Sequence, residues 1–170
     1  IEPRICMKWH SSAKSAFAVA YGMHSRMEKM DVYFVRNKGN DNPPVNKGLD
    51  YTRAHHVMLS YNYKISDVMY LQFEPYFQYL YDVPVEDGTS FSVINRLEYY
   101  VERPLVNDGK GRNYGIDLTL EKYLTGGLYW MVTASLFDSQ YKGGDGAGRD
   151  TPHNRNYISQ LLVGQEWMDF

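Results

Sequence analysis

The chain reads NYGIDLTLE from Asn113 to Glu121. Every second residue of this stretch is aromatic or aliphatic, and the residues between them are polar or glycine. Because successive side chains of a β-strand point to opposite faces, this spacing predicts a strand with one apolar and one polar face. The alternation resumes over residues 128–137, after a turn that contains Gly126 and Gly127. The two runs therefore predict a β-hairpin.

Two further hairpins are predicted towards the amino end. They pair residues 4–10 with 17–23, and residues 56–65 with 69–81. A last strand, which is less regular, is predicted from Tyr157 to Trp167. Pro75 lies on the apolar face of its strand and has no N–H to donate to the ladder, so a bulge is expected there.

Long connections rich in turn residues follow the hairpins, over residues 36–53, 82–112 and 142–156. Short and long connections alternate strictly if residues 91–102 belong to the second long loop and do not cross the sheet. The chain is therefore predicted to be all-β. We expect an antiparallel up-and-down meander of about seven long strands that forms one β-barrel segment over residues 1–170.

The apolar faces of the clearest strands carry no Asp, Glu, Lys or Arg before Lys122, at the rim of a short turn. A cation that faces lipid at the bilayer centre costs roughly 2–4 kcal/mol, so an uncharged face suits a bilayer. Tyr114 and Tyr123 lie nine residues apart near the two ends of one strand. That spacing corresponds to about 23 Å at 3.3 Å per residue and a tilt near 40°, close to the roughly 25 Å apolar band of a transmembrane β-barrel.

Composition excludes several classes of protein. The 170 residues carry 18 Lys and Arg against 20 Asp and Glu, and a net charge of -2 gives no reason to expect nucleic-acid binding. No apolar run approaches the roughly 18–20 residues of a membrane helix. The single cysteine, Cys6, cannot form an intrachain disulfide. Because the chain opens at Ile1 without a signal peptide and has an odd number of predicted strands, we expect a fragment without a plug domain.

The run GKGRNYGIDLTLEKY, residues 109–123, resembles the late barrel strands of TonB-dependent outer-membrane receptors, where a Gly-x-Gly-Arg-x-Tyr-Gly-Ile-Glu-Leu-like run is habitual. The run LFDSQYKG at residues 136–143, followed by Arg149, Asn154, Asn156 and Tyr157, resembles the next strand, loop and strand of the branch that carries an N-terminal carboxypeptidase-regulatory-like domain. Residues 20–24 and 79–85 are also similar to that family. Asp117 stands where Glu is commoner and keeps the charge.

This resemblance implies the C-terminal half of a barrel of about 22 strands, closed by a plug, in the outer membrane of a Gram-negative cell. It also implies import of a scarce nutrient, such as a siderophore, a metal complex or a glycan. The implied partners are outer-membrane lipid, the rest of the barrel and its plug, and the TonB complex through an N-terminal part outside this chain. Open sheet edges would pair with missing strands or with a second copy.

Two groups of residues are candidates for contacts. The first would face the lumen or the plug, although a hydrated strand face explains it as well: Lys64, Glu74, Asp117, Thr119 and Glu121. The second lies in the predicted long loops and suits stacking and anion or carbohydrate contact, although loop solubility explains it equally well: Tyr99, Tyr100, Arg103, Arg112, Arg149 and Arg155.

Catalytic and metal-binding motifs are not found in the sequence. The five histidines have no His-x-x-x-His spacing, and Asp145 and Asp150 do not form a calcium-loop pattern. The glycines at 109–115 do not have dinucleotide-binding spacing, and no Gly-x-Ser-x-Gly is present. We therefore expect no enzyme and no cofactor. Two alternatives stay open, because periodicity does not tell inside from outside: a soluble lipocalin-like barrel that binds a small hydrophobic ligand, and a small outer-membrane barrel that acts as an enzyme or adhesin.

Overall fold

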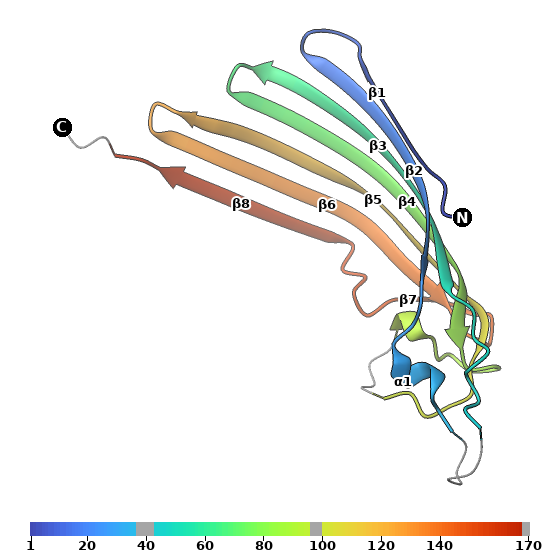
Figure 1. Ribbon diagram of the computed structural model, residues 1–170. Helices are drawn as coiled ribbons and strands as arrows, with labels where there is room; N and C mark the ends of the chain where they lie inside the picture. The colour runs from blue at the N-terminus through green and yellow to red at the C-terminus, as the bar shows by residue number, and fades with distance from the viewer. Residues whose placement is uncertain (37–42, 96–99, 168–170) are drawn as a thin grey trace.

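The structure is a computed structural model that describes residues 1–36, 43–95 and 100–167. These residues form one antiparallel sheet, with the long connections gathered at one end (Figure 1). The strands are β1 (Arg4–His10), β2 (Ser15–Arg26), β3 (Thr52–Ser66), β4 (Met69–Val85), β5 (Val106–Thr125), β6 (Leu128–Lys142), β7 (Gly148–Asp150) and β8 (Tyr157–Gln165). Helix α1 (Met30–Tyr33) and the 3-10 turn η1 (Val93–Asn95) lie in the long connections. No helix in the described ranges is both long and apolar enough to cross a bilayer.

The strands follow one another in space as they do in the sequence. Their order is β1-β2-β3-β4-β5-β6-β7, β8 also pairs with β6, and every pair is antiparallel. β7 pairs with residues 140–142 of β6 and β8 pairs with residues 128–136, so the two occupy successive lengths of the same edge. The predicted all-β meander is confirmed. β8 corresponds to the predicted last strand, whereas β7 is a short additional strand within the predicted connection over residues 142–156.

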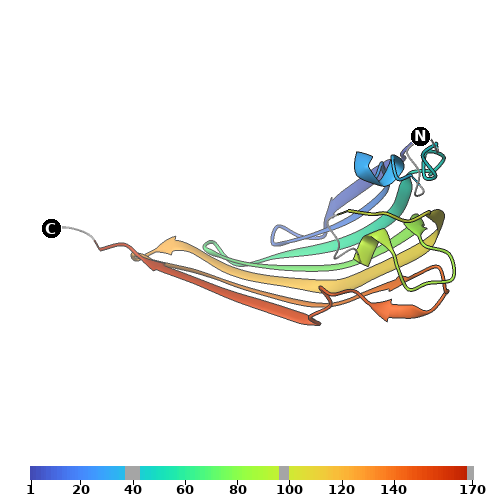
Figure 2. The same cartoon turned by 90° about the horizontal axis from the view of Figure 1, so that it is seen from below.

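Register places the apolar side chains of neighbouring strands side by side. Phe73 of β4 lies opposite Leu118 of β5, and Leu118 lies opposite Ala134 of β6. The sheet is a single curved layer (Figure 2), and large apolar side chains on it stay exposed, with Leu118 40% and Leu136 62% accessible. Among its larger apolar side chains, the described part of the sheet therefore buries only Val83, Val85 and Tyr141, all at its loop end.

A small hydrophobic core does form among the long connections, beside α1 at the loop end of the sheet (Figure 1). It consists of Val32, Val35, Val101 and Leu105, with Leu49, Phe91 and Val93 packed against it. The buried amide of Asn46 donates to the carbonyls of Val32 at 2.9 Å and Arg103 at 3.0 Å, and its Oδ1 accepts from the N–H of Leu105 at 2.8 Å. We call these residues the loop cap. Nothing in the sequence pattern predicted α1 or this core.

The bulge expected at Pro75 is wrong. Pro75 lies opposite Ile116, within a register that runs unbroken from Met69 to Leu80. A missing N–H removes one ladder hydrogen bond but does not require an extra residue. The register shifts lie elsewhere, at the ends of strands, and include those at Lys64 and Ser66 and between Leu80 and Val85.

The second long connection is shorter than predicted, because β4 and β5 continue to pair beyond the expected strand ends. Val83 lies opposite Gly109, and Val85 lies opposite Val106. Arg112 therefore belongs to a strand and not to a loop, which corrects the prediction. Within residues 91–102, the described part forms a bridge at Ser92, then η1, and no crossing strand, as predicted.

Candidate functional surfaces of the sheet

Aromatic rings form two rows on the apolar face. Near the short turns, the rings of Phe17 and Tyr61 lie 4.7 Å apart. Nearer the loops, the ring of His55 stacks on Tyr21 at 6.0 Å and on Tyr81 at 5.2 Å. The rows comprise Trp9, Phe17, Tyr61 and Tyr63 at the turn end, and Tyr21, His55, Tyr79 and Tyr81 at the loop end. Rows of aromatic side chains on either side of an apolar band are typical of membrane barrels.

Tyr123 does not belong to either row. Its ring lies 5.1 Å from the ring of Tyr70, a residue whose strand partner is Glu121 on the polar face. The predicted pairing of Tyr114 with Tyr123 across one apolar band is therefore wrong, because nine is an odd number of steps and places the two side chains on opposite faces. Trp130, opposite Lys122, is the aromatic residue of the apolar face at that end.

The five residues predicted to face the lumen share the polar face. Glu74 of β4 lies directly opposite Asp117 of β5. In adjacent rows, Gln72 lies opposite Thr119, and Tyr70 lies between Lys64 and Glu121. The register therefore brings together the candidates that the alternation had assigned to one face: Lys64, Glu74, Asp117, Thr119 and Glu121.

Lys64 has its own partner at the turn. Its Nζ lies 2.8 Å from the carboxylate of Asp67, which follows in the β3–β4 turn. The hydrogen bond from Lys64, with its positive charge, lowers the pKa of Asp67 from its usual value. This ion pair therefore links the end of β3 to the β3–β4 turn. On the polar face of β4 and β5, no lysine lies between the carboxylates of Glu74, Asp117 and Glu121.

A row of polar side chains crosses the same face nearer the loops. Gln78 donates to Nε2 of His56 at 2.6 Å, and Asn113 donates to Oε1 of Gln78 at 2.5 Å. The hydroxyl of Ser139 donates to Oδ1 of Asn113 at 2.6 Å, and the hydroxyl of Thr151 donates to that of Ser139 at 2.9 Å. Consecutive hydrogen bonds thus join β3, β4, β5, β6 and the segment after β7. We call these five residues the polar row.

The polar row is a feature that sequence reasoning missed. The alternation does assign Gln78, Asn113 and Ser139 to the polar face. What it does not supply is the register that places each opposite the next, since register depends on the turns and on the bulge at Lys64 and Ser66. No short motif marks these positions.

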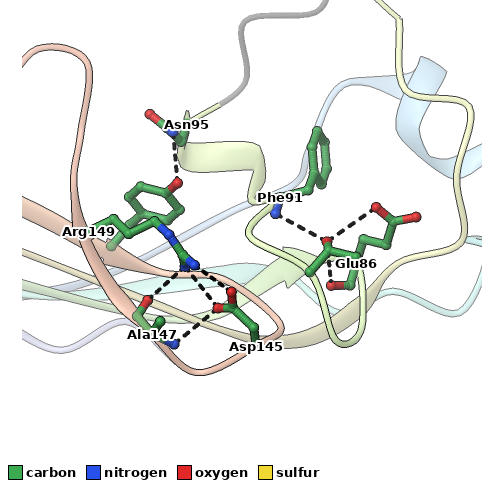
Figure 3. A network of polar contacts seen from close by, with 8 residues as sticks. Glu86, Phe91, Asn95, Asp145, Ala147 and Arg149 are labelled. Atoms are coloured by element: carbon green, nitrogen blue, oxygen red, sulfur yellow. Dashed lines mark hydrogen bonds and ion pairs between the residues drawn. The ribbon is translucent and has the colours of Figure 1, made fainter.

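A second polar network joins two loops above the sheet (Figure 3). The guanidinium of Arg149 donates to both carboxylate oxygens of Asp145, at 2.9 and 2.6 Å. The backbone N–H of Asp145 donates to the carbonyl of Thr89 at 3.0 Å, and Asn95 donates to the hydroxyl of Tyr141 at 3.0 Å. The connection after β4 and the connection after β6 are therefore bound to each other.

The Asp145 carboxylate is strongly acidic in this network. The hydrogen bonds from Arg149, followed by the bond from the N–H of Ala147, lower its pKa from 3.8 to about 2. The carboxylate stays ionised well below neutral pH, and the bidentate pair with Arg149 persists with it.

The six predicted loop residues do not gather into one site. Arg103 pairs with Glu86 at 3.0 Å and lies 4.4 Å above the ring of Phe91, and Arg149 pairs with Asp145, so both stabilise loop structure. Arg112 lies on β5 and donates to Gln140 of β6. Tyr100 and Arg155 are exposed on different loops, and Tyr99 lies outside the described residues.

No group of three or more His, Cys, Asp and Glu side chains within the described ranges is arranged to hold a metal ion. His55 and His56 point to opposite faces, His55 into an aromatic row and His56 into the polar row. Their hydrogen bonds to Tyr21 and Gln78 occupy one ring nitrogen of each. The two adjacent histidines therefore belong to opposite faces of the sheet.

Comparison with known proteins shows a similarity in fold. No protein-family model matches the sequence, and no curated protein matches it either. Among solved structures, the chain is similar to the FrpB iron transporter from Neisseria meningitidis (F3-3 variant), with a TM-score of 0.60 and 17% sequence identity. The chain has the fold of part of a transmembrane β-barrel. The match covers 85% of this chain and 21% of the transporter, so the chain spans about a fifth of that protein's length.

Proposed function

We propose that the chain is part of the barrel of a TonB-dependent outer-membrane receptor, from the C-terminal half of that barrel and from the branch with a carboxypeptidase-regulatory-like domain. The observation that carries the proposal is the uncovered apolar face, which continues across β2, β3, β4 and β5 without a charged side chain between its two aromatic rows; on β6, Asp138 lies opposite Tyr114 at the loop-side border of this face. The fold likeness to an iron transporter and the sequence resemblance of residues 109–123 support the same reading.

The two faces differ in the surroundings that they require. Leu136 and Leu161 are 62% and 70% exposed, and soluble proteins rarely leave a large contiguous apolar surface in water. On the other face, Glu74 and Asp117 lie directly opposite each other, and two like charges at such a position need water around them. Lipid on the first face and water on the second satisfy both requirements.

The orientation follows from the connections. In barrels of this kind the short turns face the periplasm and the long loops face the outside of the cell. The loop cap and the network around Arg149 would then lie on the extracellular side, where a nutrient is first met. Arg103 and Arg149 would shape the binding loops, and the exposed side chains of Tyr100 and Arg155 would contact the nutrient, with Tyr99 as a further candidate.

Transport in this proposal needs parts outside the chain. The polar face, with Glu74, Asp117, Thr119, Glu121 and Lys64, would contact a plug, and TonB would act through an N-terminal part. Within the described residues, the outer edges of β1 and β8 are unpaired, and open edges in lipid leave backbone groups unsatisfied. These edges would pair with the remaining strands. The role is binding and transport, without catalysis, of a siderophore, another metal complex or a glycan.

The test is to fractionate the source cells and to probe the fractions with an antibody raised against the chain. We expect a band several times heavier than this chain, in the outer-membrane fraction, that resists extraction by alkaline carbonate. Growth on a scarce iron or glycan source, with and without the gene, then identifies the nutrient. A soluble band of about this chain's own length would overturn the proposal and favour the soluble binding module with its apolar face turned inward.

A further inference from the structure

Three cationic side chains gather at the loop end of the apolar face. Lys110 and Arg112 lie on β5, on the same face as Tyr114, because they are four and two residues before it. Lys142 of β6 lies directly opposite Lys110. We call Lys110, Arg112 and Lys142 the cationic cluster. It lines a cavity of about 330 Å³ whose other walls are Tyr79, Gly111, Gln140, Tyr141 and Gly148.

The cations of this cluster form no ion pair within the described residues. Side chains directly opposite on antiparallel strands have Cβ atoms about 4.5–5.5 Å apart, so Lys110 and Lys142 repel each other. Neither lysine forms an ion pair with any described residue. Arg112 donates from Nε and Nη2 to a single neutral acceptor, Oε1 of Gln140, at 3.1 and 2.5 Å. That contact fixes the guanidinium but leaves its charge in place.

Three carboxylates lie in the neighbourhood, and none of them lines the cavity. Asp138 lies two residues before Gln140 on the same face of β6 and accepts a hydrogen bond from the Asn154 amide at 2.8 Å. Asp150 lies opposite Gln140 on β7, on the same face as the cluster, and is exposed. Asp108 is exposed at the start of β5 and lines a neighbouring cavity with Lys110. The cavity itself therefore presents cations, amide and phenol groups, which is the donor set that recognises a phosphate.

The height of the cluster matches the headgroup region of a bilayer. Tyr114 borders the apolar band on β5, and Arg112 and Lys110 lie about 5 and 10 Å beyond it at 3.3 Å per residue and a tilt near 40°. The polar headgroup region is about 5–8 Å thick on each side of the hydrocarbon, so Arg112 lies within it, and the backbones of Lys110 and Lys142 lie just outside it. The side chains point outwards, on the lipid side of the sheet, and not into the lumen where a nutrient would pass.

We propose that the cationic cluster binds the phosphate of an anionic lipid in the outer leaflet. Cations next to a membrane attract anionic headgroups, and the planar guanidinium of Arg112 can contact two phosphate oxygens at once. The phosphate would also relieve the repulsion between Lys110 and Lys142. This inference rests on the proposed function, because it requires the apolar face to lie in the membrane.

The test uses the native full-length protein, purified from membranes and placed in nanodiscs of phosphatidylcholine that contain fluorescent, bisphosphorylated lipid A. Retention of the label by the protein is measured for the wild type, for K110Q/R112Q/K142Q, and for the single variant Lys142→Gln. The matched control is Lys122→Gln, a cation of the same face at the opposite rim. We expect the triple variant to retain roughly tenfold less label, the single variant to lie between, and the control to match the wild type.

Equal retention by the triple variant and the wild type would overturn the inference. So would full displacement of the label by inorganic phosphate in solution, because the site would then be a general anion site. Flotation of the wild type with lipid vesicles separates the two proposals: a protein that does not float refutes the proposed function and this inference together. If the protein floats but retains no label, only this inference fails. Circular dichroism of each variant identifies misfolding, and Lys142→Gln alone then decides.

Discussion

The sheet and the loop cap treat apolar side chains in opposite ways. In the cap, Val32 is fully buried and Val101 is 3% exposed, and both pack within the protein itself. On the sheet, Leu136 and Leu161 remain more than half exposed although they belong to strands with continuous backbone pairing. The cap carries its own hydrophobic interior, whereas the sheet depends on the medium around it. The same chain therefore contains one unit that buries its apolar side chains within itself and one that leaves them exposed.

The largest effect should come from a charge on the lipid side of the sheet. Leu118→Arg places a cation near the centre of the apolar face and should destabilise the protein in lipid vesicles by roughly 2–4 kcal/mol, measured by denaturant unfolding. Its matched control is Thr119→Arg, the next residue on the same strand, which faces the polar side and should cost less than about 1 kcal/mol. If Thr119→Arg proved the more damaging of the two, the apolar face would be a core and not a lipid surface.

Removal of the buried Asn46 amide should destabilise the loop cap. Asn46→Ala removes three hydrogen bonds and leaves the N–H of Leu105 buried without its partner, a loss of about 2–3 kcal/mol. Because the cap is separate from the sheet, hydrogen exchange should accelerate in α1 and near Leu105 while β5 and β6 stay protected. Lys47→Ala, at an exposed neighbouring position, should leave exchange unchanged. Simultaneous loss of protection in the sheet would show that the two regions are one cooperative unit.

A smaller effect is expected at the turn between β5 and β6. Gly126 has a φ of 63°, a conformation that costs an alanine about 1 kcal/mol, and an added Cβ there would meet no neighbouring atom. Gly126→Ala should therefore lower stability by about 1 kcal/mol in the same unfolding assay. Gly148→Ala is the control, since Gly148 also has open space around it but is not in the left-handed region. Equal effects of the two substitutions would contradict this reading of the turn.

The smallest expected effect is the dependence of the stability of the 143–149 loop on pH. The pKa of Asp145 is about 2 in the folded loop against an ordinary value of 3.8, so the Arg149 pair stabilises the loop above pH 4 and loses this contribution as the pH falls towards 2. Limited proteolysis of the 143–149 loop with an acid-active protease should stay slow at pH 4 and become faster near pH 2. Asp145→Asn should be cleaved readily at both values. A wild type that becomes sensitive already at pH 4 would refute the depressed pKa.

The sequence predicts the parts of the fold that repeat at short range. Alternation alone separates Leu118 from Asp117, places the hairpins and gives the meander, because a strand's two faces are fixed by a period of two. It fails at the strand ends. Residues 82–112 were predicted to be a long connection because they are rich in turn residues, and Arg112 was included in it. Gly109 nevertheless lies in β5, where an added Cβ would collide with Val85, so the glycine allows two strands to approach closely.

Other features depend on contacts between distant residues. Val32 and Leu105 belong to connections without any period, so no pattern marks them as a core. The like-charge opposition of Lys110 and Lys142, and the polar row, both require the register between strands. Register is set by turn lengths and bulges, and a sequence read one strand at a time does not contain it. The predicted loop residues are dispersed because they belong to separate connections: Arg103 pairs with Glu86 within the connection after β4, and Arg149 pairs with Asp145 within the loop after β6.

The polar row has a mechanical consequence for the sheet. In four consecutive hydrogen bonds, from Thr151 through Ser139, Asn113 and Gln78 to His56, every donor points in the same direction across the strands. If β4, β5 or β6 shifted by one residue relative to both of its neighbours, the side chain that it contributes to the row would turn to the other face of the sheet. Two of these hydrogen bonds would then break, because that side chain is bonded on both sides. The row therefore resists sliding of the strands along one another near the loop end of the sheet, where the proposed orientation would place the membrane surface.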